Sequence, residues 1–99
     1  MATKRQKKAQ REHVSRVAEL GCVACYVQAG VWGTPGEIHH IREGQGAAQR
    51  SSWWSVICLC VGHHRGGEKQ KIAVHAEYKK FTIKYGSESD LVELTNKYI

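Results

Sequence analysis

The hydrophobic positions of the chain fall into short segments with either helical or strand spacing. Between Lys7 and Leu20 the apolar residues lie mostly on one helical face, and lysine and arginine occupy the other faces. Gly21 follows directly and is well placed to end this predicted helix. The residues before it, Met1 to Gln6, are polar and basic, and we expect them to form a disordered tail.

Two segments in the middle of the chain are predicted as strands. Residues 37–42 form the first, and Ser55–Leu59 form the second. The loop between them is long and contains glycine, so the two strands can pair as an antiparallel hairpin. Successive side chains of a strand point to opposite faces, which predicts that His39 and His40 face opposite ways.

The rest of the chain is predicted to be helical, with glycines that divide it. A short helix begins near Gly62, and a second helical segment runs from His75 to Gly86. The motif Ser87-x-x-Asp90 resembles a capping box, which predicts a last helix to about residue 98. The apolar residues that these two later helices would bury are Tyr78, Phe81, Tyr85, Leu91, Leu94 and Tyr98.

The three tryptophans are the largest aromatic side chains available to this chain. Trp32 lies in an irregular loop, 30–36, and its expected role is packing rather than base stacking. Trp53 and Trp54 come directly before the second strand. Strand alternation there predicts one buried ring and one partly exposed ring.

Length and charge restrict the class of protein. Ninety-nine residues allow one domain with a modest core, and a chain this short often needs a structural metal ion or a disulfide for stability. Fifteen Lys and Arg against nine Asp and Glu give a formal net charge of +6, which favours a polyanionic partner. Ribosomal and membrane-surface proteins also have an excess of basic residues.

No apolar run approaches the roughly 20 residues of a membrane span. The N-terminus lacks the apolar core of a signal peptide, so we expect a cytosolic protein with no membrane partner.

Positive charge is concentrated near the N-terminus. The basic residues of the first predicted helix form either a solvated face or an arm that follows DNA phosphates. Arg50, in the central loop, has the same two interpretations. The residues that we expect to contact nucleic acid are Lys4, Arg5, Lys7, Lys8, Arg11, Arg42 and Arg50.

Cysteine and histidine occur at spacings typical of zinc ligands. In a reducing compartment, four Cys among six His suggest metal binding before disulfides. A turn at Cys22-x-x-Cys25 would point both sulfurs to one place, as Zn–S bonds of about 2.3 Å require, and Cys60-x-x-His63 could complete the site. A thioredoxin-type redox pair is the rival for the first motif, but no βαβ pattern surrounds it. Buried thiols without metal are the other alternative.

This zinc assignment leaves two other potential ligands in the segment 58–64. Cys58 is then spare and would be a buried strand residue, although an exchange of Cys58 for His63 in the zinc site stays open. His64 is then free to hold a second, catalytic ion together with His39.

The order of these motifs, C-x-x-C, then H-H, then L-C-x-x-H-H, resembles the HNH (ββα-metal) nucleases in a zinc-knuckle version. The segments Leu20–Cys25, Ile38–Arg42, Val74–Phe81 and Lys84–Gly86 are similar to the phage Ref-type, RecA-dependent nucleases. The likeness covers about residues 14–95. It implies an α+β fold, a small ββα-metal (HNH) domain with a zinc knuckle, an N-terminal basic helix and C-terminal helices. The corresponding division is a basic arm, 1–13, and an HNH nuclease domain, 14–99.

The resemblance also implies a role for each histidine. His40 would be the general base that takes a proton from the water attacking the phosphorus. His39 and His64 would bind a catalytic divalent metal (Mg²⁺, Mn²⁺, Ni²⁺ or Zn²⁺), and His75 would be its third ligand. The alternative for His75 is a surface or packing residue. The structural Zn²⁺ would be bound by Cys22, Cys25, Cys60 and His63.

The sequence departs from the HNH pattern at one position. The middle Asn, expected near Ser55, is absent, so a backbone carbonyl or another side chain must take its place in orienting the hairpin and the base.

The expected function is that of a metal-dependent DNA endonuclease acting in phage recombination on single- or double-stranded DNA. The resemblance implies a phage- or prophage-encoded protein that is directed by RecA filaments in the cytoplasm of a bacterial host. The alternative is a non-catalytic, zinc-stapled DNA-binding module, which would not need His40 beside His39.

Overall fold

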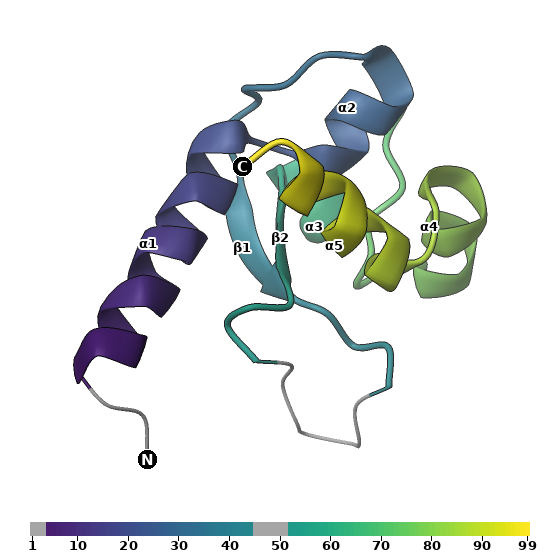
Figure 1. The fold of residues 1–99 in the computed structure, drawn as a ribbon. Coiled ribbons are helices and arrows are strands. Elements are labelled where there is room, and N and C mark those ends of the chain that lie inside the picture. Colours follow the sequence, from purple (N-terminus) through teal and green to yellow (C-terminus); the bar gives the residue numbers. More distant parts are fainter. Residues whose placement is uncertain (1–3, 45–51) are drawn as a thin grey trace.

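The computed structural model describes residues 4–44 and 52–99, and it has the mixed α+β architecture expected from the sequence. Residues 45–51, which include Arg50 and the middle of the loop between the strands, lie outside the described residues. The elements, in chain order, are α1 (Lys4–Leu20), α2 (Val23–Ala29), β1 (Glu37–His40), β2 (Val56–Leu59), α3 (Val61–His64), α4 (Tyr78–Tyr85) and α5 (Glu88–Lys97) (Figure 1).

The two strands form the antiparallel hairpin that the alternating pattern predicts. In its register Ile38 lies opposite Cys58, and His39 lies opposite Ile57. The first strand ends at His40, two residues earlier than expected, and the second begins at Val56.

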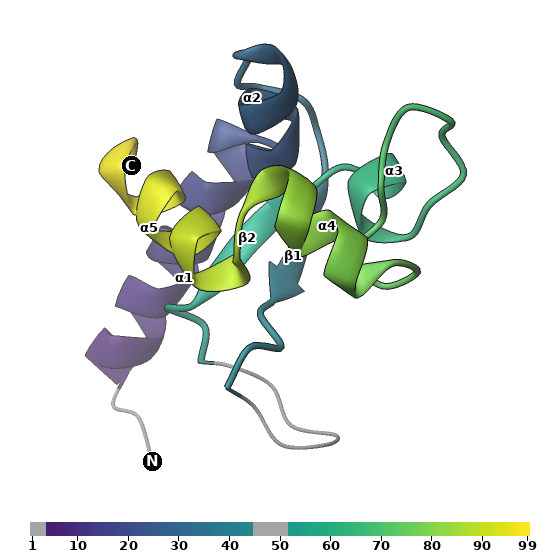
Figure 2. The same ribbon diagram turned by 90° about the vertical axis from the view of Figure 1, so that its right-hand side faces the viewer.

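The hairpin lies between two helical layers. In Figure 2, α4 and α5 lie in front of the strands and α1 lies behind them. Because both faces are covered, all four residues of β2 are buried. Val56 and Cys58 pack with Val17 of α1, whereas Ile57 and Leu59 belong to the larger cluster on the opposite face. The helices contribute to that cluster with Val23, Ala24, Phe81, Tyr85 and Leu91.

The N-terminal helix begins earlier than the sequence pattern predicts. Among the described residues α1 starts at Lys4, so the disordered tail expected up to Gln6 is wrong for its last three residues. Residues 1–3 of that expected tail lie outside the described residues. The helix also continues without interruption past residue 13, where we expected the basic arm to end, and the division into arm and domain remains a prediction.

A helix that the sequence pattern does not predict follows the first one. We expected the C-x-x-C motif to be a turn, but Cys22 is the N-cap of α2, and its Sγ accepts a hydrogen bond from the Cys25 backbone N–H at 3.3 Å. Seven residues are too few to display a helical period. The preceding Gly21 has φ +95°, and a Cβ on it would lie 2.8 Å from the backbone nitrogens of Gly33 and Thr34, so this close approach requires glycine.

The C-terminal helices agree with the pattern, except at their ends. The α4 helix begins at Tyr78 rather than at His75. The capping motif is confirmed, because Ser87 Oγ accepts a hydrogen bond from the backbone N–H of Asp90 at 3.1 Å. The expected burial of Tyr98 is wrong, since this residue follows the last turn of α5 and is 51% exposed.

The tryptophans divide differently from the expectation. Trp32 is partly buried and stacks on Tyr26 with ring centroids 4.2 Å apart, which agrees with a packing role. Trp53 and Trp54 are both exposed, by 44% and 45%. The expected alternation is wrong because both residues lie in a turn before β2 begins.

None of the helices formed by the described residues is long and apolar enough to cross a membrane.

Candidate metal centres

Four buried side chains meet at the junction of α2, β2 and α3. The N-cap and the first turn of α2 supply Cys22 and Cys25, and the N-cap and third residue of α3 supply Cys60 and His63. One donor atom from each residue lies within 4.8 Å of the other three. The structure therefore brings together the four residues that we expected to bind zinc.

The spacing of these donor atoms fits one tetrahedral ion. The sulfurs of Cys25 and Cys60 are 3.7 Å apart, and His63 Nδ1 lies 3.5, 3.5 and 3.2 Å from the sulfurs of Cys22, Cys25 and Cys60. A tetrahedral centre with Zn–S of about 2.3 Å and Zn–N of about 2.0 Å separates two sulfurs by about 3.8 Å, and sulfur from nitrogen by about 3.5 Å. The cluster could thus hold a metal ion such as zinc.

The surroundings of His63 favour the form that binds metal. Its Nε2–H donates to Gln28 Oε1 at 2.9 Å and contacts the Tyr85 hydroxyl at 3.0 Å, which leaves the Nδ1 lone pair facing the sulfurs. Burial lowers the pKa of His63 to about 4, so the imidazole is neutral at physiological pH. An outer-shell hydrogen bond of this kind fixes the tautomer and the orientation of a ligating histidine.

The thiols of the cluster have different acidities. Burial raises the pKa of Cys22 well above its usual value. Burial also raises the pKa of Cys60, but hydrogen bonds from the His63 backbone and from the Lys71 ammonium, 3.3 Å away, outweigh it, and the net shift is downward. Metal binding requires thiolates, so the lowered pKa of Cys60 favours the form of this side chain that binds a metal.

Cys58 lies apart from this cluster. It packs with Val17 and Val56 on the α1 face of the hairpin, and burial raises its pKa to about 11. The geometry therefore supports Cys58 as the spare, buried strand residue and not as a replacement for His63.

Three histidines form a second cluster at the other end of α3. His39 comes from β1, His64 is the last residue of α3, and His75 lies in the segment before α4. Their donor atoms all lie within 4.8 Å of one another, and the two Nε2 atoms of His64 and His75 are 3.0 Å apart. Two nitrogens bound about 2.1 Å from one ion at a right angle would have this separation. Burial, followed by the two neighbouring histidines, lowers the pKa of His75, which favours its neutral form.

Two carboxylates each accept a hydrogen bond from one ring nitrogen of a histidine in this cluster. His64 Nδ1–H donates to Glu37 at 2.9 Å, and His39 Nε2–H donates to Glu88 at 2.6 Å. The nitrogens left for a metal are then His64 Nε2 and His39 Nδ1. This carboxylate–histidine pairing is typical of histidines that bind metals.

The sequence interpretation did not identify Glu88. Its side chain is fully buried, and besides His39 it accepts hydrogen bonds from the Tyr78 hydroxyl at 2.7 Å and from the backbone N–H groups of Arg42 and Glu43 at 2.8 and 3.0 Å. Burial raises the pKa of Glu88, but these hydrogen bonds outweigh it and hold the pKa below the usual range. Burial and the bond to Glu88 raise the pKa of Tyr78 to about 12. Glu88 is thus a charged centre on which β1, α4 and α5 converge.

His40 occupies the last position of β1. By strand alternation it points to the opposite face from His39, and its ring meets Trp53 in a T-shaped contact with centroids 4.2 Å apart. It is therefore adjacent to the three-histidine cluster along the chain without being part of it.

The expected DNA-contacting residues are distributed over two places. Arg42 is exposed beyond β1, with its guanidinium 5.8 Å from the centre of the Tyr78 ring. Arg50 lies outside the described residues. The other expected residues are all exposed on α1: Lys4, Arg5, Lys7, Lys8 and Arg11.

Comparison with models of known protein families gives a match over nearly the whole chain. The model of the family described as "Recombination enhancement, RecA-dependent nuclease" matches residues 6–99. A search of curated proteins found no match.

Proposed function

The chain belongs to the recombination enhancement, RecA-dependent nuclease family, and from this premise we propose that it is a divalent-metal-dependent DNA endonuclease with an HNH-type active site. The observation that supports this most strongly is the cluster of His39, His64 and His75, whose donor atoms lie within 4.8 Å of one another. A module stapled only by its Cys3His cluster would not need this second set of converging imidazoles.

The order of the elements supports the HNH type. The cluster takes its first histidine from β1 and its second from α3, with β2 between them, so the ligands are delivered by a strand–strand–helix unit. In this proposal the Cys3His site, with a structural Zn²⁺, fixes α2 against α3. The second cluster is more open, because His75 is exposed, and an open position is what distinguishes a catalytic metal site from a structural one.

In the proposed mechanism His40 is the general base. An imidazole titrates near neutral pH and can accept the proton of the water that attacks the phosphorus. Its contact with Trp53 restricts the ring, which supports Trp53 as the side chain that replaces the missing Asn in orienting the base. Glu88 and Glu37 orient His39 and His64. When bound there, a divalent ion would polarise the scissile phosphate and stabilise the leaving oxygen.

The substrate follows from the family description. A RecA-dependent nuclease acts on DNA in connection with RecA, and we propose that the chain cuts DNA held in RecA filaments during phage recombination in the bacterial cytoplasm. The net charge of +6 supports a polyanionic substrate.

The test is a nicking assay on single- and double-stranded DNA, with and without RecA and Mg²⁺ or Mn²⁺. We expect His40→Ala to fold, keep its zinc and lose cleavage, typically by 10²-fold or more for a general base. His13→Ala is the matched control, because His13 is partly buried on α1 against Trp54 and lies outside both clusters. Cleavage by His40→Ala at the rate of His13→Ala would refute His40 as the general base. Absence of metal-dependent cleavage by the wild type would instead support the alternative role of a non-catalytic, zinc-stapled DNA-binding module.

A further inference from the structure

We propose that the groove between Trp53 and the N-terminal half of α1 binds single-stranded DNA, with one base stacked on the Trp53 ring and phosphates held by Lys7 and Arg11. This Trp53 groove deepens the proposed nuclease function, on which it rests, by naming the form of DNA that reaches His40.

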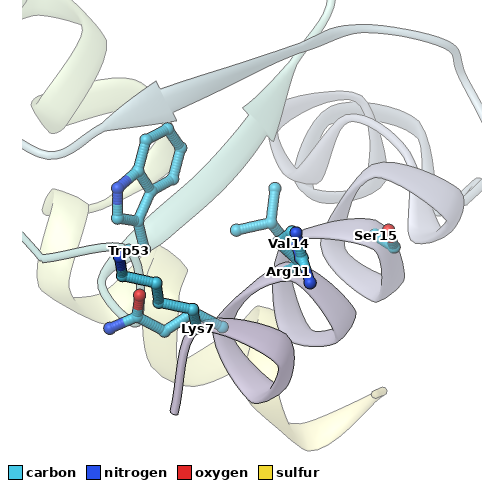
Figure 3. A pocket seen from close by; sticks show the side chains of 6 residues that line it. Lys7, Arg11, Val14, Ser15 and Trp53 are labelled. Atoms are coloured by element: carbon cyan, nitrogen blue, oxygen red, sulfur yellow. The ribbon is translucent and has the colours of Figure 1, made fainter. Parts of the chain in front are cut away.

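The groove is a defined concave surface. Its volume is about 600 Å³, within the range of roughly 300–1,000 Å³ typical of small-molecule sites. Figure 3 shows Trp53 on one side and residues of α1 on the other. Its lining combines an indole, an aliphatic side chain, two cations and two small polar groups: Trp53, Val14, Lys7, Arg11, Gln10 and Ser15.

Trp53 has the exposure that a stacking residue requires. Trp53 is 44% exposed, although it is among the largest apolar residues of the chain. The T-shaped contact with His40 covers at most one face of the indole. A base can therefore stack on the remaining ring surface, and the same indole would touch both the base and the proposed catalytic histidine.

The charge of the groove is complementary to a DNA backbone. Lys7 and Arg11 are four residues apart and therefore lie on the same face of α1. Both are exposed, and none of the six described residues that line the groove is acidic. Lysine and arginine beside an aromatic ring form the usual combination for single-stranded nucleic acid, where a basic groove follows the backbone and aromatic rings stack on bases.

The indole selects the form of DNA. In a duplex the faces of the bases are covered by their neighbours, so stacking on Trp53 requires an unpaired base. Phosphate contacts from α1 are available to either form, and they carry no such preference. The groove should therefore bind single strands more tightly than duplex.

The test measures binding without cleavage, by fluorescence anisotropy of a labelled 12-nucleotide oligo(dT) in buffer without added divalent metal. We expect Trp53→Ala to weaken binding by roughly 5- to 150-fold, the effect of losing one stacked base, and Trp53→Phe to retain most of it. Trp54→Ala is the matched control: Trp54 is equally exposed, at 45%, but does not line the groove, and we expect less than a twofold change. Binding of a blunt-ended duplex, which has no unpaired bases, should be the same for Trp53→Ala and wild type.

A second measurement does not depend on removing the indole. In a Trp32→Phe, Trp54→Phe variant, Trp53 is the only tryptophan left of the three, and oligo(dT) should quench its fluorescence. Equal losses for Trp53→Ala and Trp54→Ala, equal losses on single strand and duplex, or absence of quenching would each overturn the proposal. These experiments measure binding and not cleavage. Their outcome can therefore be interpreted even if the His40→Ala experiment refutes the proposed nuclease mechanism.

Discussion

Replacing Glu88 by Gln perturbs the candidate catalytic site through a single buried atom. Glutamine has the shape of glutamate but turns one carboxylate oxygen into an NH₂ group. The oxygen that accepts from Tyr78, Arg42 and Glu43 can be kept, so the NH₂ group then faces His39 Nε2 across 2.6 Å. Two donors cannot share that distance, and His39 relieves the conflict by moving its proton to Nδ1. The nitrogen left for a metal is then blocked.

The size of the effect follows from the interactions lost. One hydrogen bond to a charged acceptor contributes about 1.5–3 kcal/mol, so Glu88→Gln should lower the free energy of unfolding by about that amount. Outer-shell changes of this kind typically cost 10- to 100-fold in metal affinity or activity. The wild-type pKa of Glu88 is held below its usual 4.5, so its contribution to stability is complete above that pH and lost as the pH falls through the folded pKa. The free energy of unfolding of Glu88→Gln should therefore lack the decrease with falling pH that the protonation of Glu88 causes in the wild type.

The assay is the Mn²⁺ concentration needed for half-maximal nicking, together with the urea midpoint of the same preparation. Glu93→Gln is the control, because Glu93 lies on the same helix and is exposed. We expect the Mn²⁺ requirement of Glu88→Gln to rise 10- to 100-fold, with Glu93→Gln unchanged. An unchanged Mn²⁺ requirement in a Glu88→Gln protein that is destabilised as expected would refute the role of Glu88 in orienting His39.

Two other predictions concern the scaffold. Cys25→Ser should lose zinc and unfold, because a structural zinc supplies folding energy, whereas Cys58→Ser should keep its full zinc content; equal zinc contents by elemental analysis would contradict this. Gly21→Ala should lower the free energy of unfolding by more than Gly67→Ala, measured by urea titration. Both sites have positive φ and share the cost of about 1–2 kcal/mol, but only at Gly21 does a Cβ meet backbone atoms, and equal losses would argue against that close approach.

The members of the two candidate metal sites could be predicted from the sequence in part, because some of the relevant geometry is local. In C-x-x-C and C-x-x-H the two donors lie within one turn of chain, so spacing alone places them side by side. The hairpin and the capping motif at Ser87 follow from similarly short-range patterns. Spacing suggested which pairs of residues combine, and the family resemblance implied the same combination and added His75. The structure brings the donor atoms of each set within 4.8 Å of one another.

The features that the sequence did not predict depend on contacts between distant segments. Glu88 lies 49 residues from His39, and as one acid in the first turn of a helix it carries no distinguishing signal. The α2 helix is too short to show a period, and its start depends on the cap at Cys22. The exposure of Trp53 and Trp54 follows from the turn that contains them, since strand alternation does not extend there.

We propose above all that one ion stabilises the fold, while a second, exchangeable ion takes part in cleavage. The most direct measurement is dialysis against a chelator, followed by elemental analysis, circular dichroism and nicking on the same sample, before and after addition of Mn²⁺. We expect one zinc per chain and the fold to remain, cleavage to disappear, and Mn²⁺ to restore it. Loss of zinc, fold and cleavage together in a single step would contradict two separate metal sites.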